Sequence, residues 1–341
     1  MLNISEIYVF KGGVMGFKNL KNVLLVSAMV GLSAVSFGKM KRIDGYPKRP
    51  VEMVAPSGAG GGWDLTARTV SKVLKDEKII TVPTPVVNRP GGGGGVNLAY
   101  MQSKKGNGQM LSIYSPPLIL TKLTGISEYG YKDTTPIAGL IADYGAFVVG
   151  KDSKFKNITQ VMDALKKDPK SVKVGGASSA GSMDHIQFLL MAKAAGVKNL
   201  KEIDYVSFQE SGVTQILGGH IDLFTTGLSE VKGLMASGNL RALASTADKT
   251  VNGVPSCKEQ GIDATFVNWR GIFANPGVES NVIEYWTEAM KEMVKTKSWK
   301  EALVRNGWDD NFMVGEEFVS FLAKQEEDSK GILAEIGMLK N

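Results

Sequence analysis

Three glycine-rich segments carry the residue types that could bind a small anion: residues 56–64 (PSGAGGGWD), 88–95 (NRPGGGGG) and 175–184 (GGASSAGSMD). Glycine lets backbone N–H groups approach a ligand closely. A helix that begins directly after such a turn presents unpaired amides and the positive end of its dipole to an anion. We therefore expect anion binding at the first and third segments. In the second, either Arg89 clamps the structure near the cleft and the glycines allow close backbone packing, or the segment is a flexible, solvated loop.

The candidate ligand-binding residues of the first segment are Ser57, Gly58, Gly60, Gly61, Gly62, Trp63 and Asp64. Asp64 lies near the start of the helix, where a carboxylate caps free N–H groups, so we expect it to orient the loop rather than face an anion. The candidates of the third segment are Ser178, Ser179, Gly181 and Ser182, although Ser182 can also serve only as a helix cap. Trp63 and Trp269 could each wall a cleft or lie in the core.

Several other chemistries do not fit the sequence. A G-x-G-x-x-G pattern starting at Gly58 fails at Trp63, and no Gly-Lys-Ser/Thr ending makes a phosphate loop. Ser179, Asp204 and His220 stand in hydrolase order, but the nucleophile motif lacks its first glycine. We therefore expect no enzyme, and keep an α/β hydrolase only as a remote alternative.

The chain has one Cys and two His, which excludes a Cys/His metal centre and an intramolecular disulfide. The net charge is +6, but the basic residues are not clustered into a run. A nucleic-acid partner is therefore not expected. No feature indicates a cofactor.

The glycine segments are embedded in alternating strands and helices. We expect strands at residues 51–55, 85–88, 111–115, 137–141 and 146–149, and, after the pattern restarts, at 172–175, 202–206, 221–225, 240–244 and 266–273. Helices are expected at 65–75, 98–101, 185–193 and before 218, and two amphipathic helices, 282–295 and 316–336, close the chain. Two strand–glycine turn–helix runs predict an α/β fold of two lobes, each a mixed sheet flanked by helices, with the ligand at the carboxyl ends of the strands.

The first 38 residues are predicted to be an N-terminal extension and a signal peptide. Lys18 and Lys21 precede an apolar run at residues 23–37, and small residues at Ser36 and Gly38 offer a cleavage point. That run is shorter than the ~20 residues that span a membrane. Translation from Met15 would leave residues 1–14 outside the protein. We expect secretion to the periplasm and a mature chain that begins near Lys39.

A set of short motifs, in order along the chain, resembles a known family. They are YPxxPVxxVxP at residues 46–56, GGGWDxxAR at 60–68, VNRPG at 87–91, GGxID at 218–222, VPSxxExG at 254–261 and WxGIFAxP at 269–276. Together they resemble the TctC/Bug receptors of tripartite tricarboxylate transporters. The resemblance implies a two-lobed Venus-flytrap fold of the type II periplasmic binding proteins, with lobe 1 at residues 46–143 and 266–341 and lobe 2 at 144–265.

The resemblance also implies a function. Receptors of this family hold a small di- or tricarboxylate between the lobes and deliver it to a large and a small membrane permease subunit; some relatives instead act in signalling. The matching binding segments are residues 57–64 in lobe 1, and 177–182 and the turn near 207–211, with Ser207, in lobe 2. Ser57 stands where many relatives carry a bulky aromatic residue, and residues 205–211 also depart from the usual pattern. Both departures concern the distal part of the ligand.

Overall fold

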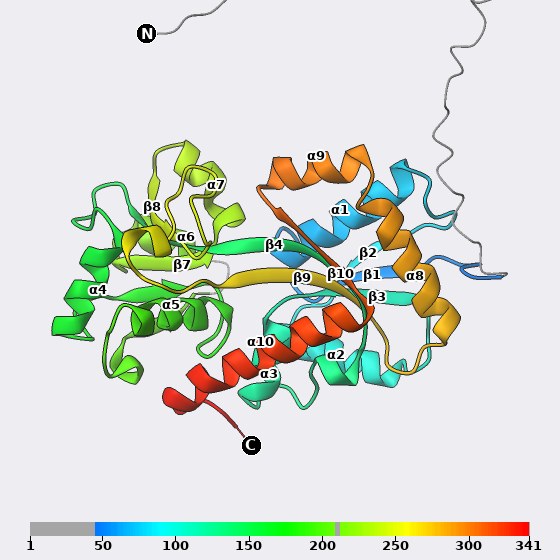
Figure 1. Ribbon diagram of the computed structural model, residues 1–341, viewed down its shortest axis with the longest axis horizontal. Helices are drawn as coiled ribbons and strands as arrows, with labels where there is room; N and C mark the ends of the chain where they lie inside the picture. Colours follow the sequence, from blue (N-terminus) through cyan, green and yellow to red (C-terminus); the bar gives the residue numbers. More distant parts are fainter. Residues whose placement is uncertain (1–44, 209–211, 341) are drawn as a thin grey trace, which may run out of the picture. The chain divides into compact units, whose positions relative to one another are not determined.

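The computed structural model describes residues 45–208 and 212–340 (Figure 1). The predicted extension and signal peptide at residues 1–38 lie outside these ranges. No helix within the ranges is long and apolar enough to cross a membrane.

Ten strands form one curled sheet with two halves. The strands are β1 (Glu52–Ala55), β2 (Val86–Asn88), β3 (Met110–Tyr114), β4 (Thr135–Gly150), β5 (Val174–Gly176), β6 (Tyr205–Ser207), β7 (Leu223–Gly227), β8 (Leu240–Ser245), β9 (Val267–Ala274) and β10 (Asp309–Val314). Their order is β2-β1-β3-β9-β4-β7-β5-β6, with β8 and β10 also paired to β4. The β1–β3 and β5–β7 pairs are parallel, while β9 and β4 run antiparallel to their neighbours. This confirms the predicted mixed α/β architecture.

Ten α-helices flank these strands in the described residues. They are α1 (Gly62–Asp76), α2 (Gly95–Ser103), α3 (Pro117–Leu123), α4 (Ile158–Lys167), α5 (Met183–Ala194), α6 (Gly212–Leu217), α7 (Leu228–Ala236), α8 (Ser280–Met293), α9 (Lys297–Asn306) and α10 (Gly315–Glu335). Short 3-10 turns lie at Gly92–Gly94, Tyr131–Asp133, Leu200–Glu202 and Lys258–Gln260.

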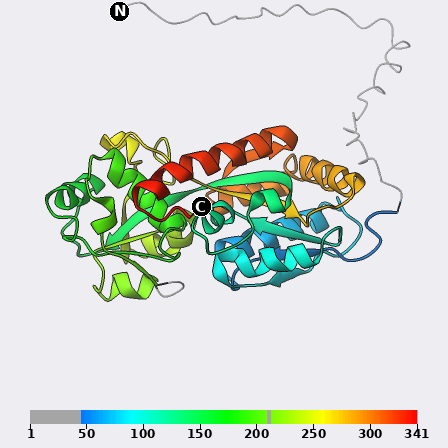
Figure 2. The same ribbon diagram turned by 90° about the horizontal axis from the view of Figure 1, so that it is seen from below.

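The helices cover both faces of each half of the sheet, because side chains alternate along every strand. In β1, Met53 and Ala55 pack with α1, α8 and α9, whereas Val54 points to the opposite face, which α2, α3 and α10 cover. In the other half, α4 and α5 cover one face while α6 and α7 cover the other. Helix α10 contacts both α3 and α5, so it spans the two halves (Figure 2).

Strands β4 and β9 join the two halves. β4 is 16 residues long and pairs with β9 from Thr135 to Tyr144. From Gly145 onward it pairs with β7 and β8 instead. The partner change falls beside the crossing proposed from the sequence, and the lobe limits 46–143 with 266–341, and 144–265, stay a prediction.

Several elements differ from the sequence-based expectation. The strands expected at 137–141 and 146–149 are one strand, β4, because the polar residues between them do not interrupt its ladder. Helices α3, α4, α7 and α9 and strand β10 were not anticipated, so three helices and a strand, rather than two helices, close the chain. Trp269 is a core residue, 1% exposed, and does not wall a cleft.

Candidate functional site

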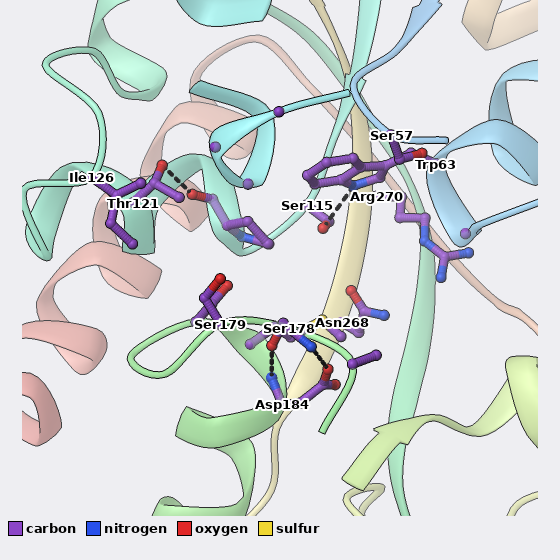
Figure 3. A pocket seen from close by; sticks show the side chains of 18 of the residues that line it. Ser57, Trp63, Ser115, Thr121, Ile126, Ser178, Ser179, Asp184, Asn268 and Arg270 are labelled. Atoms are coloured by element: carbon purple, nitrogen blue, oxygen red, sulfur yellow. Dashed lines mark hydrogen bonds between the residues drawn. The ribbon is translucent and has the colours of Figure 1, made fainter. Parts of the chain in front are cut away.

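A cavity of about 510 Å³ lies at the carboxyl ends of the parallel strands from both halves (Figure 3). Ser57 follows β1 and Ser115 follows β3, while Ala177 follows β5 on the opposite side. The full lining is Ser57, Gly62, Trp63, Gly91, Gly92, Gly93, Ser115, Pro117, Thr121, Ile126, Ala177, Ser178, Ser179, Ser182, Met183, Asp184, Glu230, Asn268 and Arg270. The topology places this cavity where α/β sheets bind ligands.

The first loop, residues 56–61, is held by the side chain of Asp64. Oδ2 of Asp64 accepts hydrogen bonds from the Gly60 amide and from Arg68 Nε, both at 2.9 Å, and its Oδ1 accepts from Asn88 Nδ2 at 2.9 Å. Gly60 has φ of +88°, a left-handed conformation that favours glycine. Burial opposes ionisation of Asp64, but these donors outweigh it and hold the pKa of its carboxyl below the usual value. Asp64 therefore orients the loop as an anion, through Gly60 rather than through amides of the helix itself.

Helix α1 begins at Gly62, so its first three amides have no carbonyl partner within the helix. Gly62 packs tightly against Arg270, since a Cβ on Gly62 would lie 2.4 Å from Arg270 Nη2. A Cβ on Gly61 would meet only the Ser57 hydroxyl at 3.6 Å, an ordinary contact distance. The Trp63 indole donates to Ser115 Oγ at 2.9 Å, which fixes the ring at the cavity wall. The close approach thus occurs at Gly62.

The second loop, residues 177–182, is held by three side chains. Asp184 Oδ2 accepts from the Ser178 amide at 2.7 Å, and the Asp184 amide donates to Ser178 Oγ at 2.9 Å. His185 Nδ1 accepts from the Gly181 amide at 2.9 Å, and the Tyr205 hydroxyl donates to the Ser178 carbonyl at 2.7 Å. The loop places Ser178, Ser179 and Ser182 on the cavity before the start of α5.

Asp184, which holds this loop, differs from Asp64 in the pKa of its carboxyl group. Burial and the nearby charge of Glu230 raise the pKa of Asp184 to about 7, although Ser178 bonds to it. Burial lowers the pKa of His185 to about 4, so the ring is neutral and accepts the Gly181 hydrogen bond, as expected for a packed residue. Desolvation by the surrounding protein also raises the pKa of Glu230. Glu230 is nevertheless an exposed residue, accessible from the cleft.

A buried ion pair lies under the cavity where the two halves of the sheet meet. Arg270 Nη2 is 3.2 Å from Asp143 Oδ2, and the two side chains are 2% and 1% exposed. The Ser229 hydroxyl and the Tyr144 amide also donate to the Asp143 carboxyl. Burial nevertheless raises the pKa of Asp143 above its usual value, with Arg270 opposing the shift.

The cavity contains half of the predicted binding residues. Ser57, Gly62, Trp63, Ser178, Ser179 and Ser182 line it. Gly58, Gly60, Gly61, Asp64, Gly181 and Ser207 are not among its lining residues, and the loop roles of Asp64 and Gly181 are described above. The predicted turn near 207–211 includes residues 209–211, which lie outside the described ranges.

The structure also adds residues that the motifs did not single out. Gly91, Gly92 and Gly93 of the second glycine segment line the cavity, so this segment belongs to the site. Asn268 and Arg270 enter it from β9, and Glu230 enters from α7. Asn268 and Arg270 are polar residues at alternate positions in an otherwise apolar strand, and that pattern was the available signal for them.

Fold and cavity together define a two-lobed solute-binding protein. The sequence profile described as "Tripartite tricarboxylate transporter family receptor" (TctC) matches residues 67–338. The chain therefore belongs to the TctC family of transporter receptors. This is a family of binding receptors rather than enzymes, which confirms that the hydrolase alternative does not apply.

Comparisons with individual proteins support the same assignment. The protein BugT of Bordetella pertussis is 25% identical over 329 residues, covering 93% of this chain and 98% of BugT. A TctC solute-binding protein from Polaromonas is 27% identical with a TM-score of 0.66, covering 85% of this chain and 99% of that one. R. palustris Rpa4515, solved with adipate, shares the fold at a TM-score of 0.77 and 20% identity, covering 86% and 98%.

Proposed function

We propose that this chain is a periplasmic receptor that captures a small di- or tricarboxylate in the cavity between its lobes and delivers it to a membrane transporter. The observation that carries this proposal is the cavity lined by both halves of the sheet, with the starts of α1 and α5 facing it. The family description supports transport of carboxylates, and the Rpa4515 structure holds a dicarboxylate.

One ligand carboxylate would lie at the start of α1. Charge-assisted hydrogen bonds from backbone amides are strong, and the amides of Gly62 and Trp63 have no partner within the helix. Ser57 adds a hydroxyl on the same side, while Ser178, Ser179 and Ser182 would close over the ligand from the second loop. The other predicted residues, Gly58, Gly60, Gly61, Asp64, Gly181 and Ser207, would shape the loops around it.

The proposal includes a motion, partners and a location. β4 and β9 connect the halves, so ligand binding would draw lobe 2 (residues 144–265) toward lobe 1 by a hinge at these strands. The closed receptor would then dock on the large and small permease subunits. The signal peptide proposed for residues 15–38 would take the chain to the periplasm.

The test is a thermal-shift screen of the mature protein against di- and tricarboxylates, followed by calorimetry. A ligand at about 100 times its dissociation constant adds about 2.7 kcal/mol to the free energy of unfolding. No stabilisation by any carboxylate would count against the proposal.

A matched pair of variants tests whether the ligand carboxylate binds at the start of α1. Gly62→Ser adds a Cβ that meets Arg270 at 2.4 Å, whereas Gly61→Ser adds one with only an ordinary contact. We expect Gly62→Ser to weaken carboxylate binding at least tenfold, a change of about 1.4 kcal/mol, and Gly61→Ser to bind like the parent. Equal binding by both variants would place the carboxylate elsewhere.

A further inference from the structure

The charged residues of the cavity do not suit a ligand that carries only carboxylates. Three of its lining residues are charged at full ionisation: Arg270, Asp184 and Glu230. The positive charge of Arg270 is already paired with Asp143 at 3.2 Å. Arg270 also acts on Glu230, but this one cation then faces three acids, Asp143, Glu230 and Asp184. A plain dicarboxylate would therefore bring two more negative charges to an acidic wall.

A second feature of the same wall points to a ligand group that donates hydrogen bonds. The side chain of Asn268 is buried, at 2% exposure, and its Oδ1 has no hydrogen-bond partner. Asn268 lines the cavity, and Figure 3 shows its amide between Ser115 and Asp184. An unpaired buried acceptor destabilises the protein, and a donor from a ligand would remove that cost.

The two carboxylates contribute in different ways. Asp184 uses its oxygens within the protein, because Oδ2 accepts from the Ser178 amide and Oδ1 from Gln187 Nε2 at 3.3 Å. Glu230 accepts from Thr226 through Oε2 at 2.7 Å and is exposed to the cleft. Glu230 therefore supplies an accessible acceptor, and Asp184 adds negative charge behind it.

The remaining titratable groups around this wall leave its charge unchanged. The His185 ring is turned to the Gly181 amide and is neutral. The Tyr205 hydroxyl donates to the Ser178 carbonyl. Asp143 is paired with Arg270, which is the one basic side chain in the cavity lining.

We propose that Glu230 and Asn268, backed by the charge of Asp184, form an acidic subsite that binds a protonated amine of the ligand. The ligand would thus be an amino-carboxylate, with a carboxylate at the start of α1 and its ammonium group at this subsite. The inference rests on the proposed function, because it assumes that the ligand carboxylate lies in the same cavity. A metal ion is a poorer occupant, since no group of three His, Cys, Asp or Glu within residues 45–208 and 212–340 is arranged to hold one.

The test compares ligands that differ only in the substituent. Succinate, malate and aspartate share a four-carbon skeleton and carry, at the second carbon, no donor, a hydroxyl or an ammonium group; glutarate and glutamate form a five-carbon pair. Calorimetry on the mature protein should find the amino acid at least tenfold tighter than the plain diacid in one of the two series. Hydrogen bonds to charged groups contribute about 1.5–3 kcal/mol, which corresponds to a tenfold or larger change.

Glu230→Gln tests the subsite and removes one negative charge. We expect this variant to bind the amino acid about tenfold more weakly and the plain diacid more tightly, so the preference shrinks from both sides. Glu284→Gln on α8 removes the same charge from an exposed position and is the matched control. In the parent protein, the amino acid should bind more tightly as the pH rises through the titration of Asp184, whereas a plain diacid should bind more weakly.

The outcomes separate this inference from the function on which it rests. If carboxylates bind, but diacids bind as tightly as their amino counterparts, the acidic subsite is wrong and the receptor function stands. A preference for malate over aspartate would identify a hydroxyl subsite and overturn the ammonium assignment. If no carboxylate binds, with or without an amine, the proposed function itself fails. An unchanged preference in Glu230→Gln would also refute the role of this residue.

Discussion

The two loops that face each other across the cavity are built alike, but their acidic residues are not. In each, an aspartate in the first turn of the following helix accepts a hydrogen bond from a loop amide: Asp64 from Gly60, and Asp184 from Ser178. Both aspartates are buried, at 3% and 1% exposure. Yet the pKa of Asp64 lies below its usual value, and that of Asp184 is raised to about 7.

Burial raises the pKa of both carboxyls, and the groups around them then act in opposite directions. Part of this difference comes from the residue one helical turn further on. Side chains four residues apart are neighbours on a helix. Asp64 has Arg68 in that place, and Arg68 donates to it while its own side chain remains 54% exposed. Asp184 has Phe188, which is fully buried in the core. One loop is therefore held by a carboxylate with a cation, and the other by a carboxyl group next to another acid, Glu230.

This asymmetry underlies the different tasks that we propose for the two sides of the cavity. The first loop has its negative charge neutralised, so the start of α1 can attract a carboxylate. The second side keeps negative charge near Asp184 and Glu230, which favours a positively charged ligand group or a bound proton. If the proposed ligand assignment holds, the same loop design would bind opposite charges on the two sides of the cavity.

The largest expected effect comes from removing Arg270, the cation between the two sides. It packs against Gly62 and pairs with Asp143. Arg270→Met leaves Asp143 buried without its cation, and breaking a buried ion pair costs about 3–5 kcal/mol. Urea unfolding should show this loss at neutral pH. Because an unpaired Asp143 is stable only when protonated, the loss should be smaller at pH ~5 and grow as the pH rises.

A double variant provides the control for Arg270. Asp143→Asn with Arg270→Met removes both charges and keeps an oxygen that can accept from the Tyr144 amide, while the new NH2 group can donate to the Ser229 hydroxyl. We expect it to recover most of the lost stability. A single Arg270→Met variant that loses less than about 1 kcal/mol, the range of an exposed pair, would mean that the ion pair contributes little.

The second prediction concerns the pH dependence of the two aspartates. The pKa of Asp184 is higher in the folded state than in the unfolded state. At a pH between these two pKa values, the folded protein binds more protons than the unfolded chain. The free energy of unfolding therefore falls as the pH rises from ~4 to ~7. At 1.36 kcal/mol per pH unit, this contribution reaches about 4 kcal/mol. The side chain in Asp184→Asn is neutral at every pH, so this variant should lose this part of the dependence of stability on pH. Its amide oxygen can still accept the hydrogen bond from the Ser178 amide.

The matched control for this slope is Asp64→Asn, because Asp64 titrates below that window. Urea unfolding at several pH values should show the parent slope in Asp64→Asn and a flatter one in Asp184→Asn. The same slope in both variants would show that another group controls it.

The sequence allowed the two loops to be predicted because their signals are local. Residues 56–64 and 175–184 each hold a strand end, a glycine turn and a helix start within ten residues, and six predicted residues of these loops line the cavity. The alternating strands and helices likewise predicted the α/β fold.

The rest of the site depends on contacts between distant residues. Arg270 meets Asp143 across 127 positions, and Asn268 lies opposite Asp143 only because β4 and β9 pair in that register. Glu230 was missed because α7 itself was not anticipated. β4 was read as two strands since Asp143 and Tyr144 interrupt its apolar pattern, and the ion pair that makes Asp143 tolerable cannot be read from neighbouring residues.

The smallest expected effect separates the hydrogen bonds of Asp64 from its charge. Asp64→Ala removes the acceptor of the Gly60 amide, and a hydrogen bond of this kind contributes about 0.5–1.5 kcal/mol to the free energy of unfolding. Asp64→Asn keeps an acceptor oxygen and loses the ion pair with Arg68, which contributes little to stability because the Arg68 side chain is exposed. We therefore expect Asn to lie between Ala and the parent in stability, and closer to the parent.

Carboxylate binding by the same two variants shows what the first loop requires. If Asp64 acts by ordering the loop, Asp64→Asn should bind nearly as well as the parent and Asp64→Ala more weakly. If its charge repels the ligand, both variants should bind more tightly than the parent. Calorimetry distinguishes these results, and only the first agrees with a loop whose acid is neutralised by Arg68.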